Sequence, residues 1–432
     1  MLNMKNSKFS TLIKLIIASL WNLLTLSTAF ASAPSVEAIA QVYGDGEHVS
    51  AVVLNYDKTI SPDAVTADKF SVPGRKISNV YVTNLPEPNN NHAESGNYII
   101  IELSQPPMSD KSIVPHSADD IAQRRAMGKT GPELGSHGNP HPLPECNIQV
   151  QQLKDIQATD GSICPAFPLT VSTKTRELVV EDFIQKTYTD SKQNNSQLEY
   201  NLFIPKNYDA AQKYPLVLFM HDAGTVSPEV KATLVQGRGA IVWAEPSWQE
   251  KHPCFVLAPQ YDTIIVDDNY DYGPELDCTM HLLQELTEEY SIDTSRIYNT
   301  GQSMGGMTTI AMDVKYPDFF AASYPVACKW NSAVTSPLGQ QNIWVVSSEG
   351  DPGAESSLKE IFGSLEKEGS FVKYLTMDLS LPADDINNAI TALIEPNCHL
   401  YYTNYTNGTH RSTWQHAYDM YPALEWIFAQ QK

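Results

Sequence analysis

The alternation of apolar and polar residues changes character near residue 178. Before that point, short runs alternate between apolar and polar positions and are separated by turn-forming residues. Such runs are typical of strands with one buried and one exposed face, and together they predict a β-sandwich. The predicted strands of this region are residues 50–56, 77–82, 98–103 and 148–153.

Residues 105–145, between the last two of these strands, are rich in Pro, Gly, Ser and His and show no periodicity. We expect a long mobile insertion here. It contains His116, His137 and His141, but no i, i+4 spacing or carboxylate partner frames them. The pattern therefore favours a solvated loop over a metal site.

From residue 178 onward, predicted strands and helices alternate. A hairpin over residues 179–187 and 199–204 is followed by an apolar run at 214–220, the kind of strand that is buried on both faces. This alternation predicts a mostly parallel sheet covered by helices on both sides. The later strands are expected at 255–258, 296–300, 320–326, 343–347 and 400–404, and helices at 274–290 and 417–430.

Residues 296–312 predict a strand, a tight turn and a helix, with Gly-Gln-Ser-Met-Gly at the turn. Gly301 and Gly305 suit a sharp elbow because a Cβ at either position would collide with neighbouring backbone. The elbow presents Ser303 at the positive end of the helix, so Ser303 is the candidate nucleophile. The alternative is a glycine-punctuated loop with a surface serine.

A serine hydroxyl needs a base to take its proton and an anion to orient that base. Asp351 and His410 each follow a predicted strand, so both lie in loops at the carboxyl edge of the sheet. The order Ser, Asp, His is the order found in α/β-hydrolases. Glu349 is an alternative acid, and His416 is an alternative histidine that we interpret as structural.

The segment His221-Asp222-Ala223-Gly224 follows the apolar strand and contains small residues. We expect the Ala223 and Met304 N–H groups to form an oxyanion hole. His221 is interpreted as a support for this loop. Asp222 should point away from the oxyanion, because its charge would oppose the charge that develops there.

Three aromatic residues lie in connections that could border the acyl pocket. They are Trp243, Tyr261 and Trp330, and the loop at residues 262–273 lies in a similar connection. Packing within the core is an equally good interpretation of these residues, and the sequence leaves both open.

The 432 residues suit two domains, and the formal net charge of -21 argues against nucleic acid or an anionic membrane as a partner. Lys5, Lys8 and Lys14 precede an apolar run at 15–26 and Ala-Ser-Ala at 31–33. This order predicts a signal peptide, residues 1–33, that is cleaved after Ala33. The mature protein is then expected to be secreted or periplasmic, with no membrane segment.

Six cysteines in an exported chain favour disulfides. Among the possible pairs, we expect a disulfide between Cys146 and Cys164 in particular. No C-x-x-C or clustered Cys/His spacing is present in the sequence, so no structural zinc site is expected. The serine chemistry described above needs no metal or organic cofactor.

The motifs at 220–224, 301–306, 349–352 and 408–414 resemble those of secreted α/β-hydrolase esterases. With the strand-rich first half, the chain looks like the EstA-type esterases, in which an immunoglobulin-like domain precedes a hydrolase domain related to prolyl oligopeptidases and feruloyl esterases. The resemblance implies an immunoglobulin-like domain at 34–172, an α/β-hydrolase domain at 173–432 and a Ser303, Asp351, His410 triad. It also implies hydrolysis of short-chain carboxylic esters.

The expected function is therefore a carboxylesterase-type serine hydrolase that acts on a small-molecule ester. Within the same fold, a feruloyl or polyester esterase and a peptidase remain open. A catalytically inactive hydrolase scaffold that serves as a binding protein is the alternative from another class. The sequence also leaves open whether the protein forms a homo-oligomer.

Overall fold

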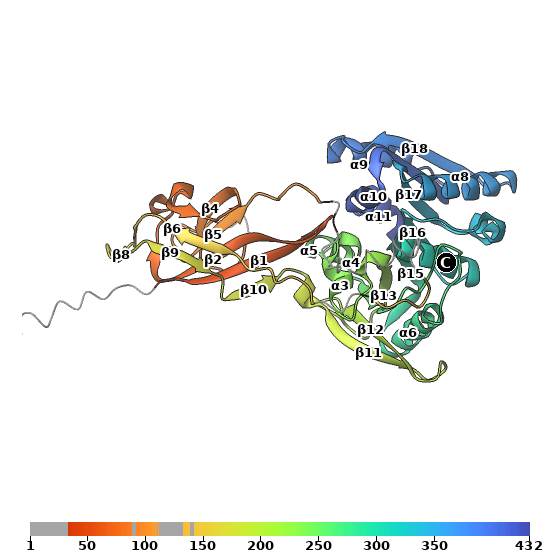
Figure 1. Ribbon diagram of the computed structural model, residues 1–432, viewed down its shortest axis with the longest axis horizontal. Helices are drawn as coiled ribbons and strands as arrows, with labels where there is room; N and C mark the ends of the chain where they lie inside the picture. Colours follow the sequence, from red (N-terminus) through yellow and green to blue (C-terminus); the bar gives the residue numbers. More distant parts are fainter. Residues whose placement is uncertain (1–32, 89–91, 110, 112–132, 139–141) are drawn as a thin grey trace, which may run out of the picture. The chain divides into compact units, whose positions relative to one another are not determined.

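The computed structural model describes residues 33–88, 92–109, 111, 133–138 and 142–432. The predicted signal peptide lies outside the described residues except for Ala33, as do His116 and His141 and most of the 105–145 insertion. The chain divides into two compact units (Figure 1). The first comprises Met1–Glu37, Ala51–Ser104 and Ile148–Lys174, and the second comprises Ala38–Ser50, Gln105–Asn147 and Thr175–Lys432.

The N-terminal region is built from strands, as the alternating pattern predicts. A five-stranded sheet has the order β10-β1-β2-β5-β4, a three-stranded sheet the order β3-β6-β9, and β7 pairs with β8. The strands are β1 (Ser35–Tyr43), β2 (Gly46–Ile60), β3 (Phe70–Ser71), β4 (Ile77–Thr83), β5 (Gly96–Leu103), β6 (Gln149–Gln152), β7 (Ile156–Gln157), β8 (Ile163–Cys164), β9 (Phe167–Val171) and β10 (Lys174–Glu177). Two short 3-10 turns, η1 (Pro62–Ala64) and η2 (Ala67–Lys69), precede β3.

The second unit contains a nine-stranded sheet with the order β11-β12-β14-β13-β15-β16-β17-β19-β18. Its strands are β11 (Ile184–Asp190), β12 (Ser196–Phe203), β13 (Tyr214–Met220), β14 (Phe255–Gln260), β15 (Ile292–Gln302), β16 (Ala322–Val326), β17 (Ile343–Gly350), β18 (Val372–Asp378) and β19 (Leu400–Thr409). The β11/β12 and β12/β14 pairs are antiparallel, and every other pair is parallel. This arrangement confirms the predicted mostly parallel sheet.

Helices cover both faces of this sheet. They are α3 (Ala232–Val235), α4 (Arg238–Ala244), α5 (Pro246–Gln249), α6 (Glu275–Glu289), α7 (Met304–Lys315), α8 (Pro352–Lys367), α9 (Ala383–Leu393), α10 (His410–Ala417) and α11 (Tyr421–Phe428). The 3-10 turns of the unit are η3 (Val180–Asp182), η4 (Ala223–Thr225), η5 (Ser332–Val334) and η6 (Ser336–Gln340).

Strand β13 explains why the run at 214–220 is apolar at every position. Leu216 and Leu218 belong to a core cluster that includes residues of α6, α7 and α8. Val217 and Phe219 belong to a second cluster with residues of α4 and α11. Because side chains alternate along a strand, a central strand between two helical layers needs apolar residues throughout.

The structure differs from the predictions at several points. The predicted strand at 179–187 is a 3-10 turn followed by β11, and β18 was not predicted. All six cysteines are among the described residues and all are free, so the expected bridge between Cys146 and Cys164 is absent. Within the described part of the chain, every helix is too short or too polar to cross a bilayer.

Candidate active site

Ser303 occupies the single residue between β15 and α7, with φ 53°. A residue with a side chain rarely adopts this conformation, which costs of the order of 1 kcal/mol and persists only where the surrounding fold enforces it. A Cβ on Gly305 would lie 1.9 Å from the Met220 carbonyl oxygen, and one on Gly301 would lie 2.4 Å from the Gly305 carbonyl carbon. Both positions therefore require glycine, as the elbow motif predicts.

Asp351 and His410 follow directly after the paired ends of two parallel neighbours, β17 and β19. Gly350 is aligned with Thr409 in this pair, after a register shift. A Cβ on Gly350 would lie 2.2 Å from the Gly408 carbonyl oxygen, so glycine allows the strand ends to approach this closely. The acid and the histidine consequently emerge side by side.

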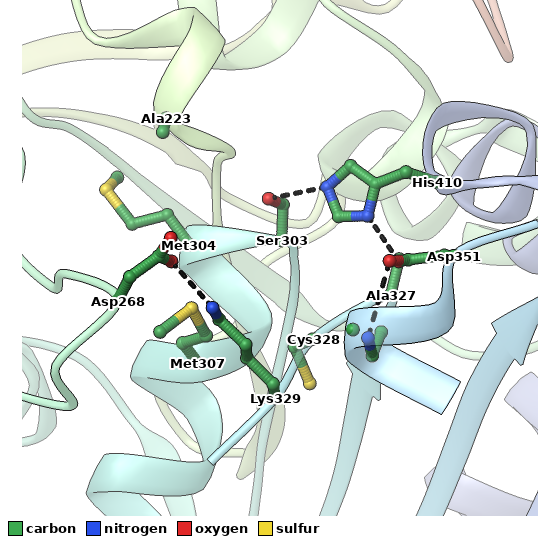
Figure 2. Close-up of a pocket in the computed structure, with 12 residues that line it drawn as sticks. Ala223, Asp268, Ser303, Met304, Met307, Ala327, Cys328, Lys329, Asp351 and His410 are labelled. Carbon is green, nitrogen blue, oxygen red and sulfur yellow. Dashed lines mark hydrogen bonds and ion pairs between the residues drawn. The ribbon is translucent and has the colours of Figure 1, made fainter. Parts of the chain in front are cut away.

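The three side chains form one hydrogen-bonded series (Figure 2). The His410 Nε2 atom lies 3.0 Å from the Ser303 hydroxyl, and its Nδ1 atom contacts the Asp351 carboxylate. The other Asp351 oxygen accepts a hydrogen bond from the Ala354 N–H at 3.3 Å, at the start of α8. The structure therefore brings together the three residues expected to form the triad.

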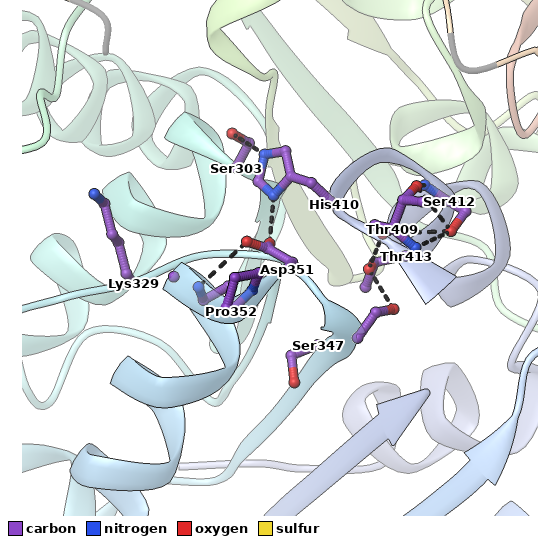
Figure 3. Close-up of polar contacts among 12 residues, drawn as sticks. Ser303, Lys329, Ser347, Asp351, Pro352, Thr409, His410, Ser412 and Thr413 are labelled. Carbon is purple, nitrogen blue, oxygen red and sulfur yellow. Dashed lines mark hydrogen bonds and ion pairs between the residues drawn. The ribbon is translucent and has the colours of Figure 1, made fainter. Parts of the chain in front are cut away.

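The strand ends that carry the acid and the histidine are tied to each other (Figure 3). Thr409 caps α10, because its hydroxyl accepts from the Ser412 N–H while the Ser412 hydroxyl accepts from the Thr409 N–H at 2.7 Å. The Thr413 hydroxyl donates to the Thr409 carbonyl and lies 2.6 Å from the Ser348 hydroxyl. These contacts hold the first turn of α10, where His410 begins the helix.

The alternative acid and histidine have other surroundings. Glu349 is exposed at the end of β17. The carboxylate that contacts His410 is that of Asp351. The His416 Nδ1 atom lies 2.9 Å from the Ser412 carbonyl oxygen, one turn earlier in α10, as expected for a structural histidine.

Ala223 and Met304 are the first residues of η4 and α7, and both line the pocket that contains Ser303. The first N–H groups of a helix have no partner within that helix, so these two are available to an anion. The Asp222 carboxylate accepts hydrogen bonds from the Gly224 N–H at 2.7 Å and from the Gln302 amide at 3.2 Å. It is thus held within the loop, as expected.

His221 is fully buried behind this loop. Its Nε2 atom accepts a hydrogen bond from the Tyr261 N–H at 3.0 Å, and its Nδ1 atom lies 2.9 Å from the Asp222 carbonyl oxygen. Burial lowers the pKa of the imidazole and keeps the ring neutral. These contacts fit the predicted role of a loop support.

The pocket beside Ser303 has a volume of about 290 Å³. Met307 and Cys328 line its apolar part, and an ion pair between Lys329 and Asp268, 3.1 Å long, lines its charged part. The 262–273 loop, which contains Asp268, was expected to border the pocket, but no local pattern joins this loop to Lys329. The one signal for Lys329 is that it closely follows a strand at the edge where Ser303 lies.

The three aromatic candidates do not line this pocket. Trp243 is fully buried, and its indole N–H donates to the Gly239 carbonyl within α4. The Tyr261 hydroxyl lies 3.0 Å from the Thr279 hydroxyl in the core. Trp330 is buried with its ring edge-on to Tyr270. For these residues, the packing interpretation matches their positions.

The described residues contain no group of three or more His, Cys, Asp or Glu side chains that could hold a metal ion.

The fold and the Ser303 site together define an α/β-hydrolase. Residues 35–165 match the family model described as the esterase Ig-like N-terminal domain. The solved crystal structure of a thermostable esterase is similar over 92% of this chain and 100% of its own, with 27% identity and a TM-score of 0.75.

A relative from Aspergillus flavus, described as probable acetylxylan esterase A, is 25% identical over 160 residues. The aligned part is 36% of this chain, and the chain spans about half the length of that relative. The family-model match and the similarity to both esterases confirm the predicted resemblance to EstA-type esterases, with an immunoglobulin-like domain ahead of an α/β-hydrolase domain. Both relatives are described as esterases, which is the class expected from the sequence.

Proposed function

We propose that the protein is an exported serine carboxylesterase that hydrolyses short-chain carboxylic esters. The observation that carries this proposal is the series of contacts from Asp351 through His410 to Ser303, at a strained elbow beside a pocket. The predicted signal peptide at residues 1–33 supports export of the protein to the periplasm or beyond the cell.

In this proposal, the Ser303 hydroxyl attacks the ester carbonyl while His410 Nε2 takes its proton. Asp351 holds the imidazole with Nδ1–H toward the carboxylate and stabilises the imidazolium. The oxyanion accepts hydrogen bonds from the Ala223 and Met304 N–H groups. The imidazolium then gives its proton to the departing alkoxide, which leaves the acyl group on Ser303.

Deacylation repeats the sequence with water as the nucleophile. His410 removes a proton from the water, and the resulting hydroxide attacks the acyl carbon. The second tetrahedral intermediate collapses with release of a carboxylic acid, and the imidazolium of His410 gives its proton to the departing Ser303 oxygen.

A small acyl group is supported by two observations. The pocket volume of about 290 Å³ is at the lower end of the range for small-molecule sites. The Aspergillus flavus relative is described as a probable acetylxylan esterase, a name that indicates an acetyl ester as its substrate.

Replacement of Ser303 by Ala tests the proposal. Hydrolysis of an aryl acetate should fall by about 10⁴-fold or more, because the acyl-enzyme can no longer form. The thermal unfolding temperature should be close to that of the unmodified protein. Turnover that survives the substitution would contradict the assignment of Ser303.

A fluorophosphonate probe separates the esterase from an inactive scaffold. The unmodified protein should be labelled covalently at Ser303, and the Ser303→Ala variant should not be labelled. A folded, unmodified protein that fails to react would support the binding-protein alternative.

A further inference from the structure

The candidate catalytic pocket contains a second charged pair, which the proposed triad does not use. Lys329 Nζ lies 3.1 Å from an Asp268 carboxylate oxygen, and both residues line the pocket with Ser303. Their side chains are 30% and 44% exposed. The pair is thus accessible to a molecule that enters the pocket.

The pair lies on the side of Ser303 away from His410. Lys329 and His410 flank Ser303 from opposite sides in both close-up views (Figures 2 and 3). Because His410 must protonate the departing alcohol, the alcohol lies on the histidine side of the nucleophile. The acyl chain therefore extends from the carbonyl toward Lys329 and Asp268.

The loop that carries Asp268 is held in a fixed turn. The carboxylate of the preceding residue, Asp267, accepts hydrogen bonds from the Asn269 N–H at 2.9 Å and from the Asp271 N–H at 3.2 Å. Val266 and Tyr272 form a β-bridge at the base of the turn. Asp268 is consequently presented from a preorganised loop.

The segment that carries Lys329 is fixed as well. Cys328 is buried on one side of it. On the other side, the Trp330 N–H donates to the Ser357 hydroxyl, which in turn donates to the Trp330 carbonyl, each at 3.0 Å. Trp330 also packs edge-on against Tyr270, with ring centres 5.5 Å apart, which joins this segment to the Asp268 loop.

We propose that the Lys329–Asp268 pair is the specificity-determining wall of the acyl pocket, which admits short acyl groups and disfavours long apolar ones. This inference rests on the proposed esterase function. A long aliphatic chain would contact the pair and remove water from both charges without replacing the lost hydrogen bonds. A shorter acyl group covers less of the pocket lining, so its binding removes less water from the pair.

The test compares kcat/KM for p-nitrophenyl acetate and p-nitrophenyl octanoate. The variants are Lys329→Met, which removes the charge and keeps most of the length of the side chain, and the double variant Lys329→Met with Asp268→Leu. The ratio of the octanoate value of kcat/KM to the acetate value should rise about tenfold or more in the double variant. Lys315→Met is the matched control, because Lys315 forms a 2.6 Å ion pair with Asp277 outside this pocket, at a similar exposure of 32%.

The possible failures are distinguishable. Suppose that the unmodified protein hydrolyses aryl esters, but that the octanoate-to-acetate ratio of both pocket variants stays within twofold of the ratio of the unmodified protein. The proposal about the Lys329–Asp268 pair is then refuted, and the proposed esterase function stands. If the unmodified protein hydrolyses neither ester and is not labelled by a fluorophosphonate, both proposals are refuted. An equal rise in the Lys315→Met control would also overturn the assignment to this pair.

Discussion

Gly305 allows the first turn of α7 to touch the backbone of β13. A Cβ there would meet the Met220 carbonyl oxygen, which is main chain and has little freedom to move. The close approach brings the N-terminus of α7, and with it the Met304 N–H, to the level of the nucleophile. The backbone geometry at Ser303 thus depends on the absence of a Cβ atom at Gly305.

Gly305→Ala is therefore expected to destabilise the protein by about 3 kcal/mol or more. Denaturant unfolding measures this change. Gly363→Ala is the control, because Gly363 is also helical but its Cβ would meet nothing within 4 Å. That substitution should stabilise the protein by up to about 1 kcal/mol. Equal effects at the two positions would show that the contact with Met220 is unimportant.

Asp351→Asn tests the role of the acid. An amide in place of the carboxylate favours the wrong imidazole tautomer, so kcat should fall by about 10⁴-fold with little change in KM. Glu349→Gln should leave kcat within about twofold, since Glu349 is exposed. Steady-state kinetics on an aryl acetate measures both. The opposite ranking would make Glu349 the acid.

Ser303, Asp351 and His410 could be predicted from the sequence because each directly follows a strand of a parallel sheet. The carboxyl ends of parallel strands meet at one edge of the sheet, so residues that follow such strands are expected to lie near one another. Lys329 also closely follows a strand, but nothing in the sequence joins it to Asp268, since only the folded loops bring the two residues together. Trp243 shows the limit of the same reasoning. Its place in a connection says nothing of side-chain direction, and the α4 backbone turns it into the core.

Among the elements, α7 contains a buried acid that the proposed mechanism does not use. Asp313 is fully buried, and one of its oxygens accepts from the Asn299 amide at 3.0 Å and from the Ser323 hydroxyl at 2.8 Å. The other Asp313 oxygen and the Asn299 carbonyl oxygen have no hydrogen-bond partner. Burial raises the pKa of Asp313 to about 7, so the carboxyl is protonated in mildly acidic solution.

Asp313→Asn should therefore change how stability depends on pH. Because the pKa is raised in the folded state, the stabilisation is complete below the unfolded value of 3.8 and is lost as pH rises through about 7. The loss is on the order of 3 kcal/mol in the unmodified protein and absent in the variant. Chemical denaturation of both proteins at pH 5 and pH 8 measures it. Parallel pH profiles would contradict the assignment.

The secondary-structure elements that could not be predicted from the sequence are those whose hydrophobic pattern is weak or overlaps with another motif. β18 is the edge strand of its sheet, and only Val372 and Met377 are buried in it, so it lacks a continuous apolar run. The first turn of α10 begins at His410, where a loop was expected. The start of this helix is marked by a capping box, formed by the hydroxyl groups of Thr409 and Ser412. In the sequence these two residues overlap with the motif around His410.

At the scale of the whole molecule, each of the two compact units is built from three separate segments of the chain. Ala38–Ser50 and Gln105–Asn147 group with the hydrolase unit although they come from the N-terminal region. Within that unit, the Leu178 N–H donates to the Ala40 carbonyl at 2.9 Å, and the Gly138 N–H donates to the Asp262 carbonyl at 2.7 Å. The domain boundary at residue 172 stays a prediction.

A chain that begins at residue 173 tests this organisation against a chain that begins at residue 34. The shorter chain loses both early segments and the hydrogen bonds that they make, so it should melt at least about 5 °C lower. Differential scanning calorimetry measures the shift, and hydrolysis of an aryl acetate checks the site. Equal melting temperatures would mean that the early segments contribute nothing to the hydrolase unit.

The chain passes between the two units five times, at residues 37/38, 50/51, 104/105, 147/148 and 174/175. Because each unit is made of several separate segments, the units cannot be exchanged as two continuous stretches of sequence. No single genetic break would release either unit intact, so duplication, loss or grafting of one half is obstructed. Moving one unit into another protein would require several joins in the chain, which favours inheritance of both units together.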